Sequence, residues 1–204
     1  MIVATYITYN DIETIQESIE SIENKVDRIV VIDGKFRDFP GKHWDSTDGT
    51  LEYLLGLNID LISSLNADQV GKRNSYLDQL SEGDICLNLD ADEVLEGDIP
   101  ELDTDVGLID IFEFNDRRRH RRYNRFFRFR DGLHYWGKHY LILDKDNDCF
   151  TTLEHPTKKY THKKIEGFRL IHKGKLRSQQ RELDKKKYYE SKRIREARVN
   201  EPIN

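Results

Sequence analysis

Two carboxylates one residue apart, Asp90 and Asp92, close an apolar run at residues 84–89. A run of this kind predicts a buried strand. Open α/β sheets bind ligands at the carboxyl ends of their strands, so both carboxylates would lie at a strand tip. Hard oxygen ligands suit Mg²⁺ or Mn²⁺, which keep coordination positions for substrate phosphates. An isolated Asp-x-Asp also fits a solvated acidic turn, and the elements upstream decide between these readings.

Apolar, β-branched segments alternate with helical patterns through the first half of the chain. The expected strands are residues 2–9, 28–33, 59–63 and 84–89. The expected helices are residues 12–22, a segment that begins near Thr50, and residues 72–80. Strands that alternate with helices indicate a parallel sheet with right-handed crossovers.

The pattern changes after residue 100. Strands are expected at 106–114, 126–129 and 135–143 without clear helices between them, and a charged helix at 178–198. The sequence therefore predicts one α/β domain over residues 1–204. Residues 1–100 would form a nucleotide-binding half, and residues 101–204 a more antiparallel half.

Composition fits a folded protein in a reducing compartment. The chain has 204 residues, of which 35% are charged and 37% hydrophobic. No apolar stretch reaches the ~18–20 residues of a membrane span, and the amino terminus lacks the pattern of a signal peptide. Two cysteines provide neither a disulfide framework nor a Cys-rich metal site. We expect a cytoplasmic protein.

The net charge of −5 hides two opposite halves. Residues 1–110 hold 7 Lys/Arg against 25 Asp/Glu, whereas residues 111–204 hold 26 against 13. The basic half includes an arginine run over residues 117–122, continued at Arg125, Arg128 and Arg130. This segment could contact an anionic membrane or a phosphorylated acceptor, could bind single-stranded nucleic acid through interleaved aromatics, or could be a solvated face.

Polar residues end three of the expected strands. Thr8, Tyr9 and Asn10 end the first strand, Asp33 ends the second, and Asp90 leads to Asp92 after the fourth. Because these tips share one edge of a doubly wound sheet, they could share one ligand. Tyr9 could face a base, Asp33 could accept a base N–H, and a cation at Asp92 would neutralise a diphosphate.

This arrangement resembles the GT-A glycosyltransferases, family 2 in particular. The matching segments are residues 8–10, Asp33 with residues 46–50 including Asp48, residues 71–74, and residues 84–93. The resemblance implies a Rossmann-like fold of nucleotide-diphospho-sugar transferases, with a mixed, mainly parallel sheet flanked by helices. It also implies a UDP- or GDP-type sugar donor, Mn²⁺ or Mg²⁺, and transfer to an acceptor hydroxyl with inversion. One departure is the insertion at residues 34–45, which would be a lid or a surface loop.

The resemblance also assigns roles. Asp92 would bind the metal directly, Asp90 would contact the ribose or the metal through water, and the late His172 would complete the metal or diphosphate site. Lys72 and Arg73 would reach the donor's phosphates or sugar, although a solvated helix face explains Lys72 almost as well. Asn74 could also reach the donor.

The catalytic base is less clear. Residues 125–128 and 135–140 resemble the acceptor-side segment of one branch of family 2, but Tyr140 stands where that branch has glutamate. An inverting transfer needs a general base within reach of the acceptor hydroxyl. The candidates are Glu154, which we favour, His139 and Asp148. Asp148 belongs to an acidic segment, residues 144–148, that fits a hairpin turn better than a calcium loop.

The leading hypothesis is a metal-dependent glycosyltransferase. A nucleotidyltransferase would carry a glycine-rich loop where residues 8–11 lie, which argues against it. A non-catalytic nucleic-acid- or anion-binding protein built on residues 117–130 would leave the Asp-x-Asp strand unexplained, and a degenerate transferase stays open. The acceptor could be lipid-linked, a glycan or a protein, and the chain could lie at the periphery of a membrane.

Overall fold

The computed structural model describes residues 1–115, 119–137, 141–151, 159–174 and 178–199. The first half contains β1 (Ile2–Thr8), α1 (Ile12–Glu20), β2 (Arg28–Asp33), α2 (Thr50–Leu55), β3 (Asp60–Ser63), α3 (Gln69–Leu77) and β4 (Ile85–Asp90). The second half contains β5 (Glu93–Gly97), β6 (Val106–Glu113), β7 (Arg119–Arg128), β8 (His134–Tyr135), β9 (Ile142–Leu143), β10 (Cys149–Thr151), β11 (His162–Lys164), β12 (Phe168–His172) and α4 (Gln179–Val199).

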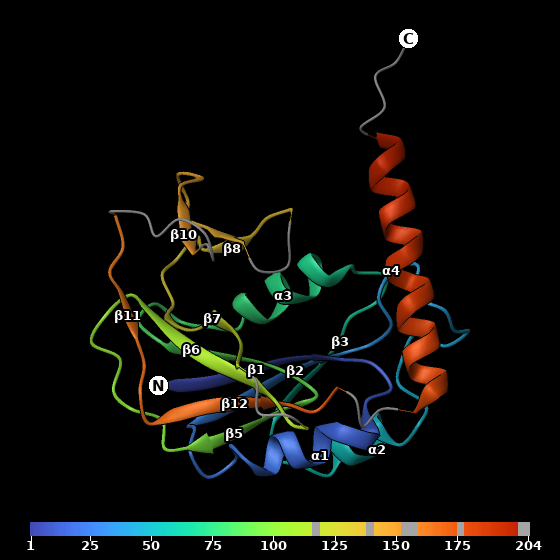
Figure 1. Ribbon diagram of the computed structural model, residues 1–204, viewed down its shortest axis with the longest axis horizontal. Helices are drawn as coiled ribbons and strands as arrows, with labels where there is room; N and C mark the ends of the chain where they lie inside the picture. Colours follow the sequence, from blue (N-terminus) through green and yellow to red (C-terminus); the bar gives the residue numbers. More distant parts are fainter. Residues whose placement is uncertain (116–118, 138–140, 152–158, 175–177, 200–204) are drawn as a thin grey trace.

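A mixed, mainly parallel sheet forms the body of the protein, which confirms the expected fold class. Its strand order is β3-β2-β1-β4-β7-β6-β12-β5, with β11 beside β6, and β10-β9-β8 form a separate small sheet. Strands β1 to β4 pair in parallel, whereas β7 runs antiparallel to both β4 and β6, and β5 runs antiparallel to β12. Helices α1 and α2 lie on one side of the sheet and α3 on the other (Figure 1).

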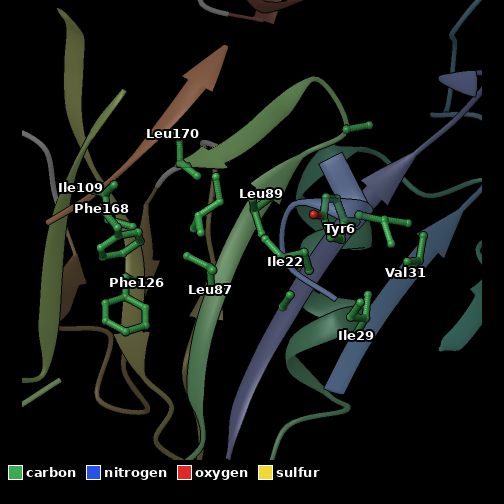
Figure 2. Close-up of a cluster of buried hydrophobic side chains, with 14 of the residues drawn as sticks. Tyr6, Ile22, Ile29, Val31, Leu87, Leu89, Ile109, Phe126, Phe168 and Leu170 are labelled. Atoms are coloured by element: carbon green, nitrogen blue, oxygen red, sulfur yellow. The ribbon is translucent and has the colours of Figure 1, made fainter. Parts of the chain in front are cut away.

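The central strands are buried on both faces, as a sheet covered by helices requires. Alternate residues of β1 point into different cores: Ala4 and Tyr6 join the cluster of Ile15 and Ile19 from α1, and Val3 and Ile7 join the cluster of Tyr76 and Leu77 from α3. Figure 2 shows the first cluster, in which Tyr6, Val31, Leu87 and Leu89 come from three neighbouring strands.

The strand register brings the polar tips to one edge of the sheet. Thr8 of β1 lies opposite Asp33 of β2, and Ile7 of β1 lies opposite Asp90 of β4. Asp33 also pairs with Ser63 at the end of β3. The predicted convergence of the first, second and fourth strand tips is therefore present in the fold.

Several predicted boundaries differ from the structure. Helix α3 begins at Gln69 rather than Lys72, because the side chain of Asp68 caps it by accepting from the Gly71 amide at 2.8 Å. Strand β7 extends well before the predicted residues 126–129. Strands β5 and β12 were not predicted at all. No helix in the described part of the chain is both long and apolar enough to span a membrane.

Candidate functional site

Asp90, at the tip of β4, is held by two arginines. It accepts from Arg73 Nη2 at 2.9 Å through Oδ1 and from Arg125 Nη2 at 2.7 Å through Oδ2. Both guanidinium groups also donate to Asn88 Oδ1, two residues earlier on the same strand. This cage fixes the rotamer of Asp90 and balances its charge. Each carboxylate oxygen already accepts from a guanidinium, which fits a contact with ribose or with a metal-bound water better than sole ligation of a cation.

The side chain of Glu93 stabilises this arrangement of Asp90 and its arginines. Its side chain is buried, accepts from the Asp90 amide at 2.8 Å and pairs with Arg125 at 3.2 Å. Burial raises the pKa of Glu93 to about 7, and Arg125 opposes that shift. The buried carboxyl group of Glu93 therefore closes the short turn between β4 and β5, next to the Asp-x-Asp motif.

Asp92 belongs to a chain of three titratable side chains. Its buried Oδ2 lies 3.2 Å from His172 Nε2, and His172 Nδ1 lies 3.2 Å from Glu113 Oε1. The hydrogen bond to Asp92 raises the pKa of His172 from 6.5 to about 9. A divalent cation bound at Nε2 would take the place of the proton on that nitrogen. This distance places His172 beside the second aspartate of the motif. Its role in completing a metal or diphosphate site stays a prediction.

A divalent cation at this edge of the sheet would have Asp92 and His172 as its candidate protein ligands. Among the described residues, no three His, Cys, Asp or Glu side chains form a group that could hold a metal ion by themselves. A magnesium-type site, however, often uses one or two protein ligands and completes its shell with substrate phosphates and water. A Cβ on Gly174 would lie 2.8 Å from His172 Nε2 and 2.9 Å from Asp92 Oδ2, so any side chain at this position would crowd the two groups. Asp92 and His172 are the side chains that would hold such a cation, with its other ligands coming from a diphosphate.

Asp33 is buried beneath the loop that follows β2. Its Oδ1 accepts from Ser46 Oγ at 2.6 Å and its Oδ2 from the Ser46 amide at 3.1 Å. Burial raises the pKa of this carboxyl, and the hydrogen bonds from Ser46 oppose the shift. Asp33 thus holds Ser46, which directly follows the inserted loop, at the end of β2. The recognition of a nucleotide base by Asp33 stays a prediction.

The other residues that were predicted to contact the sugar donor lie at the end of β1 and in the segments that follow β1 and β2. Hydrogen bonds connect these segments to one another. Thr8 Oγ1 donates to Asp11 at 3.1 Å, and Tyr9 donates its hydroxyl to the His43 carbonyl at 3.1 Å. Asn10 accepts from the Thr47 amide at 2.7 Å, while Asp48 accepts from Thr50 and from the Ile12 amide. These contacts bind the tip of β1 to the start of α2. Whether any of them also touches a donor stays a prediction.

The side chain of Lys72 is fully buried, so the interpretation that it lies on a solvated face of the helix was wrong. Its ammonium donates to the carbonyls of Thr8, at 3.2 Å, and Gly34, and it lies 4.7 Å from the ring centre of Phe36. Burial lowers its pKa from 10.5 to about 7. Lys72 therefore joins the carboxyl ends of β1 and β2.

Asn74 connects α3 to the small sheet. Its amide donates to the Tyr135 carbonyl at 3.2 Å, and its Oδ1 accepts from the Tyr135 amide at 2.6 Å. Because both ends of its amide group bond to the backbone of Tyr135, Asn74 fixes the small sheet beside α3.

A small cavity lies at the strand tips, and α4 forms its outer wall. Its volume is about 120 Å³. Its sheet side includes Arg73, Asp90, Asp92 and His172; its outer side includes Phe36, Phe39, Arg181, Lys185, Tyr188 and Tyr189. Pockets that hold small-molecule ligands usually enclose ~300–1,000 Å³. A nucleotide sugar would therefore need this outer wall to move.

The inserted loop packs against α4 rather than lying loose on the surface. Phe36 stacks on Tyr188 with ring centres 6.0 Å apart, and Phe39 lies 5.4 Å from the same ring. Arg181 donates to the Tyr9 carbonyl and lies 3.4 Å from Asp11 Oδ1. Tyr9, Phe39 and Tyr188 form a buried cluster separate from the two main cores. We call the loop 34–45 and the first three turns of α4 the aromatic cover.

A wider groove of about 890 Å³ lies beside the cavity. The ends of β6 and β12 contribute Glu113, His172 and Gly174, and α4 contributes the facing side. His172, Lys185 and Tyr189 line both spaces, so the groove adjoins the cavity at His172. Two adjoining spaces are what a reaction between two substrates needs.

Of the three candidates for the base, the structure describes only Asp148. Glu154 and His139 lie outside the described residues, as do Arg117, Tyr140 and Arg177. Asp148 lies in the turn between β9 and β10, where Lys159 contacts it at 2.8 Å and where it does not line the cavity or the groove. The hairpin predicted for residues 144–148 is confirmed, because the Asp144 amide donates to the Asp148 carbonyl at 2.9 Å.

Sequence reasoning missed two carboxylates and misplaced one arginine. Arg125 was expected on the acceptor side, but the β4–β7 pairing brings it to Asp90. Glu93 follows the Asp-x-Asp motif directly, and its proximity was a usable signal. Glu113 had no local signal, since only the β6–β12 pairing places it opposite His172.

Comparisons with known proteins give partial structural matches. No family model and no curated protein matches the chain. A structure of S. aureus TarS is 26% identical with a TM-score of 0.43, and the match covers 58% of this chain and 23% of that one. The 1–349 fragment of TarS in complex with UDP is 26% identical with a TM-score of 0.44, covering 58% and 38%. The same fragment with UDP-GlcNAc is 25% identical with a TM-score of 0.42, covering 58% and 36%. This chain thus spans less than half the length of each of these structures.

Proposed function

We propose that this protein is a metal-dependent glycosyltransferase that moves a sugar from a nucleoside diphosphate to an acceptor hydroxyl. The observation that carries the proposal is the meeting of Asp90, Asp92, Arg73 and His172 around one cavity at the carboxyl edge of the sheet. The parallel tips of β1, β2 and β4 build this edge, which is where open α/β sheets bind nucleotides. The four segments that resemble family 2 of the GT-A enzymes surround the same edge.

In this proposal each charged group acts on the diphosphate or on its cation. Asp92 and His172 would hold Mg²⁺ or Mn²⁺ together with diphosphate oxygens. The cation would stabilise the negative charge that develops on the departing nucleoside diphosphate. Arg181 and Lys185 line the same cavity from α4 and would face the phosphates once the donor is bound. Arg73 and Arg125 would act indirectly, because they fix Asp90.

The wider groove is the place for the acceptor in this proposal. It adjoins the cavity at His172, so an acceptor hydroxyl in the groove could approach a sugar whose diphosphate lies at Asp92. The acceptor class stays open between a lipid-linked molecule, a glycan and a protein. An inverting reaction with Glu154 as the base remains part of the proposal.

The test is hydrolysis or transfer from a panel of UDP- and GDP-sugars with Mn²⁺, Mg²⁺ or EDTA. Asp92→Ala should abolish both reactions while the circular dichroism spectrum stays unchanged. Asp98→Asn, which removes an exposed carboxylate outside the cavity, is the matched control and should keep wild-type rates. Full activity in the Asp92→Ala protein would contradict the proposed site.

A further inference from the structure

His172 is held from both sides of its ring. Its Nε2 lies 3.2 Å from Asp92 Oδ2, and its Nδ1 lies 3.2 Å from Glu113 Oε1. The pairing of β12 with β6 sets this geometry, because His172 and Glu113 are partners in that parallel register. The Glu113 side chain is only 17% exposed, so its carboxylate lies against the ring rather than in open solvent.

A histidine that binds a metal through one nitrogen usually donates from the other to a carboxylate or a carbonyl. That second contact selects the tautomer, fixes the ring plane and makes the ligating nitrogen more basic. Glu113 makes this kind of contact at Nδ1. The remaining nitrogen, Nε2, is the one that faces Asp92.

Neighbouring backbone restricts the same ring. The Gly174 backbone passes so close that a Cβ there would lie 2.8 Å from His172 Cε1. The Lys173 amide donates to the Asp92 carbonyl at 2.7 Å, which ties the end of β12 to the Asp-x-Asp turn. These contacts set the position of the ring, and among the described residues the Glu113 side chain is placed to set its tautomer through Nδ1.

We propose that Glu113 is a positioning residue that holds His172 in the Nδ1–H tautomer, with Nε2 directed at a divalent cation shared with Asp92. This inference rests on the proposed function, because it assumes that Asp92 and His172 hold the cation. It assigns Glu113, which no motif of the sequence marks, to the support of that site.

The experiment measures Mn²⁺ affinity by electron paramagnetic resonance, with UDP or GDP present, in wild type, Glu113→Ala and Glu113→Gln. Loss of an outer carboxylate of this kind typically weakens metal binding by ~10–100-fold, which is the expected effect of Glu113→Ala. Glu113→Gln keeps an acceptor oxygen for Nδ1–H and should recover part of the affinity. Glu96→Gln is the matched control, because it removes a carboxylate that pairs with Arg169 of β12 but does not contact His172.

A second readout separates positioning from a general loss of structure. Nitrogen-15 spectra of the histidines report the tautomer, and Glu113→Ala should shift the His172 signals while the other histidines keep theirs. Equal Mn²⁺ affinity in wild type and Glu113→Ala would overturn the role of Glu113 but leave the proposed function standing. No Mn²⁺ binding by the wild type, with either nucleotide, would overturn the proposed metal site and this inference with it.

Discussion

At the scale of single residues, the carboxylates in and around the Asp-x-Asp motif each have a partner of opposite charge. Asp90 has two arginines, Glu93 has Arg125, and Asp92 has the ring of His172. Buried ions are stable only when partners replace the water they lose. The same edge of the sheet can therefore keep these three carboxylates close together.

The burial of Lys72 can be tested by the pH dependence of the protein's stability. Its pKa is about 7 when folded against 10.5 for the ordinary side chain, so between these values the unfolded chain binds the proton that the folded chain has released. Stability should therefore rise with pH in this window, by up to about 1.4 kcal/mol per pH unit from this group. We expect the stability difference between wild type and Lys72→Met to grow in favour of wild type from pH 7 to 9, measured by urea unfolding.

Comparing the two proteins at each pH is the control, because other titrating groups contribute to both. A difference that stays constant over this range would contradict the lowered pKa of Lys72.

At the scale of elements, the aromatic cover determines access to the strand tips. Tyr188 of α4 packs on Phe36 and Phe39 of the inserted loop, and the cavity behind them is about 120 Å³. Figure 1 shows α4 beside the sheet, with its C-terminal end projecting beyond the sheet. The cover has its own small cluster, and Phe36 links that cluster to the main core beside α3.

We expect Tyr188→Ala to speed the association of the nucleoside diphosphate, because it removes a ring that must otherwise leave its contacts with the loop. Stopped-flow binding with Mn²⁺ measures the rate. Glu190→Ala is the control on the same helix, since Glu190 is exposed and does not line the cavity. An unchanged or slower association in Tyr188→Ala would show that the cover does not limit access.

The elements also show how far the sequence could predict this site. Local patterns sufficed for the first, second and fourth strands and for the carboxylates at their tips, because apolar runs and end residues lie next to each other in the chain. The partners of those carboxylates could not be read in this way. Arg125 and Glu113 reach the site through pairing between distant strands, and Lys72 is buried by contacts that its polar neighbours in the sequence do not signal.

At the scale of the whole molecule, charge is divided along the chain. Residues 1–110 carry a net −18 and residues 111–204 a net +13. A basic half gains about 1 kcal/mol for each Lys or Arg that approaches an anionic bilayer, and salt screens that gain. We expect the protein to sediment with anionic liposomes at low salt and to be released at high salt. Equal recovery with neutral and anionic liposomes would rule out this peripheral contact.

The most direct test of the central claim is a thermal-shift panel of UDP, GDP, CMP and dTDP with Mn²⁺, Mg²⁺ or EDTA, run on wild type and Asp92→Asn. A ligand that binds only the folded state must raise its apparent stability. The account predicts a rise with one nucleoside diphosphate that requires the metal and disappears in Asp92→Asn. No rise with any nucleotide, or a rise of the same size in EDTA and in Asp92→Asn, would contradict a donor site built on Asp92 and its cation.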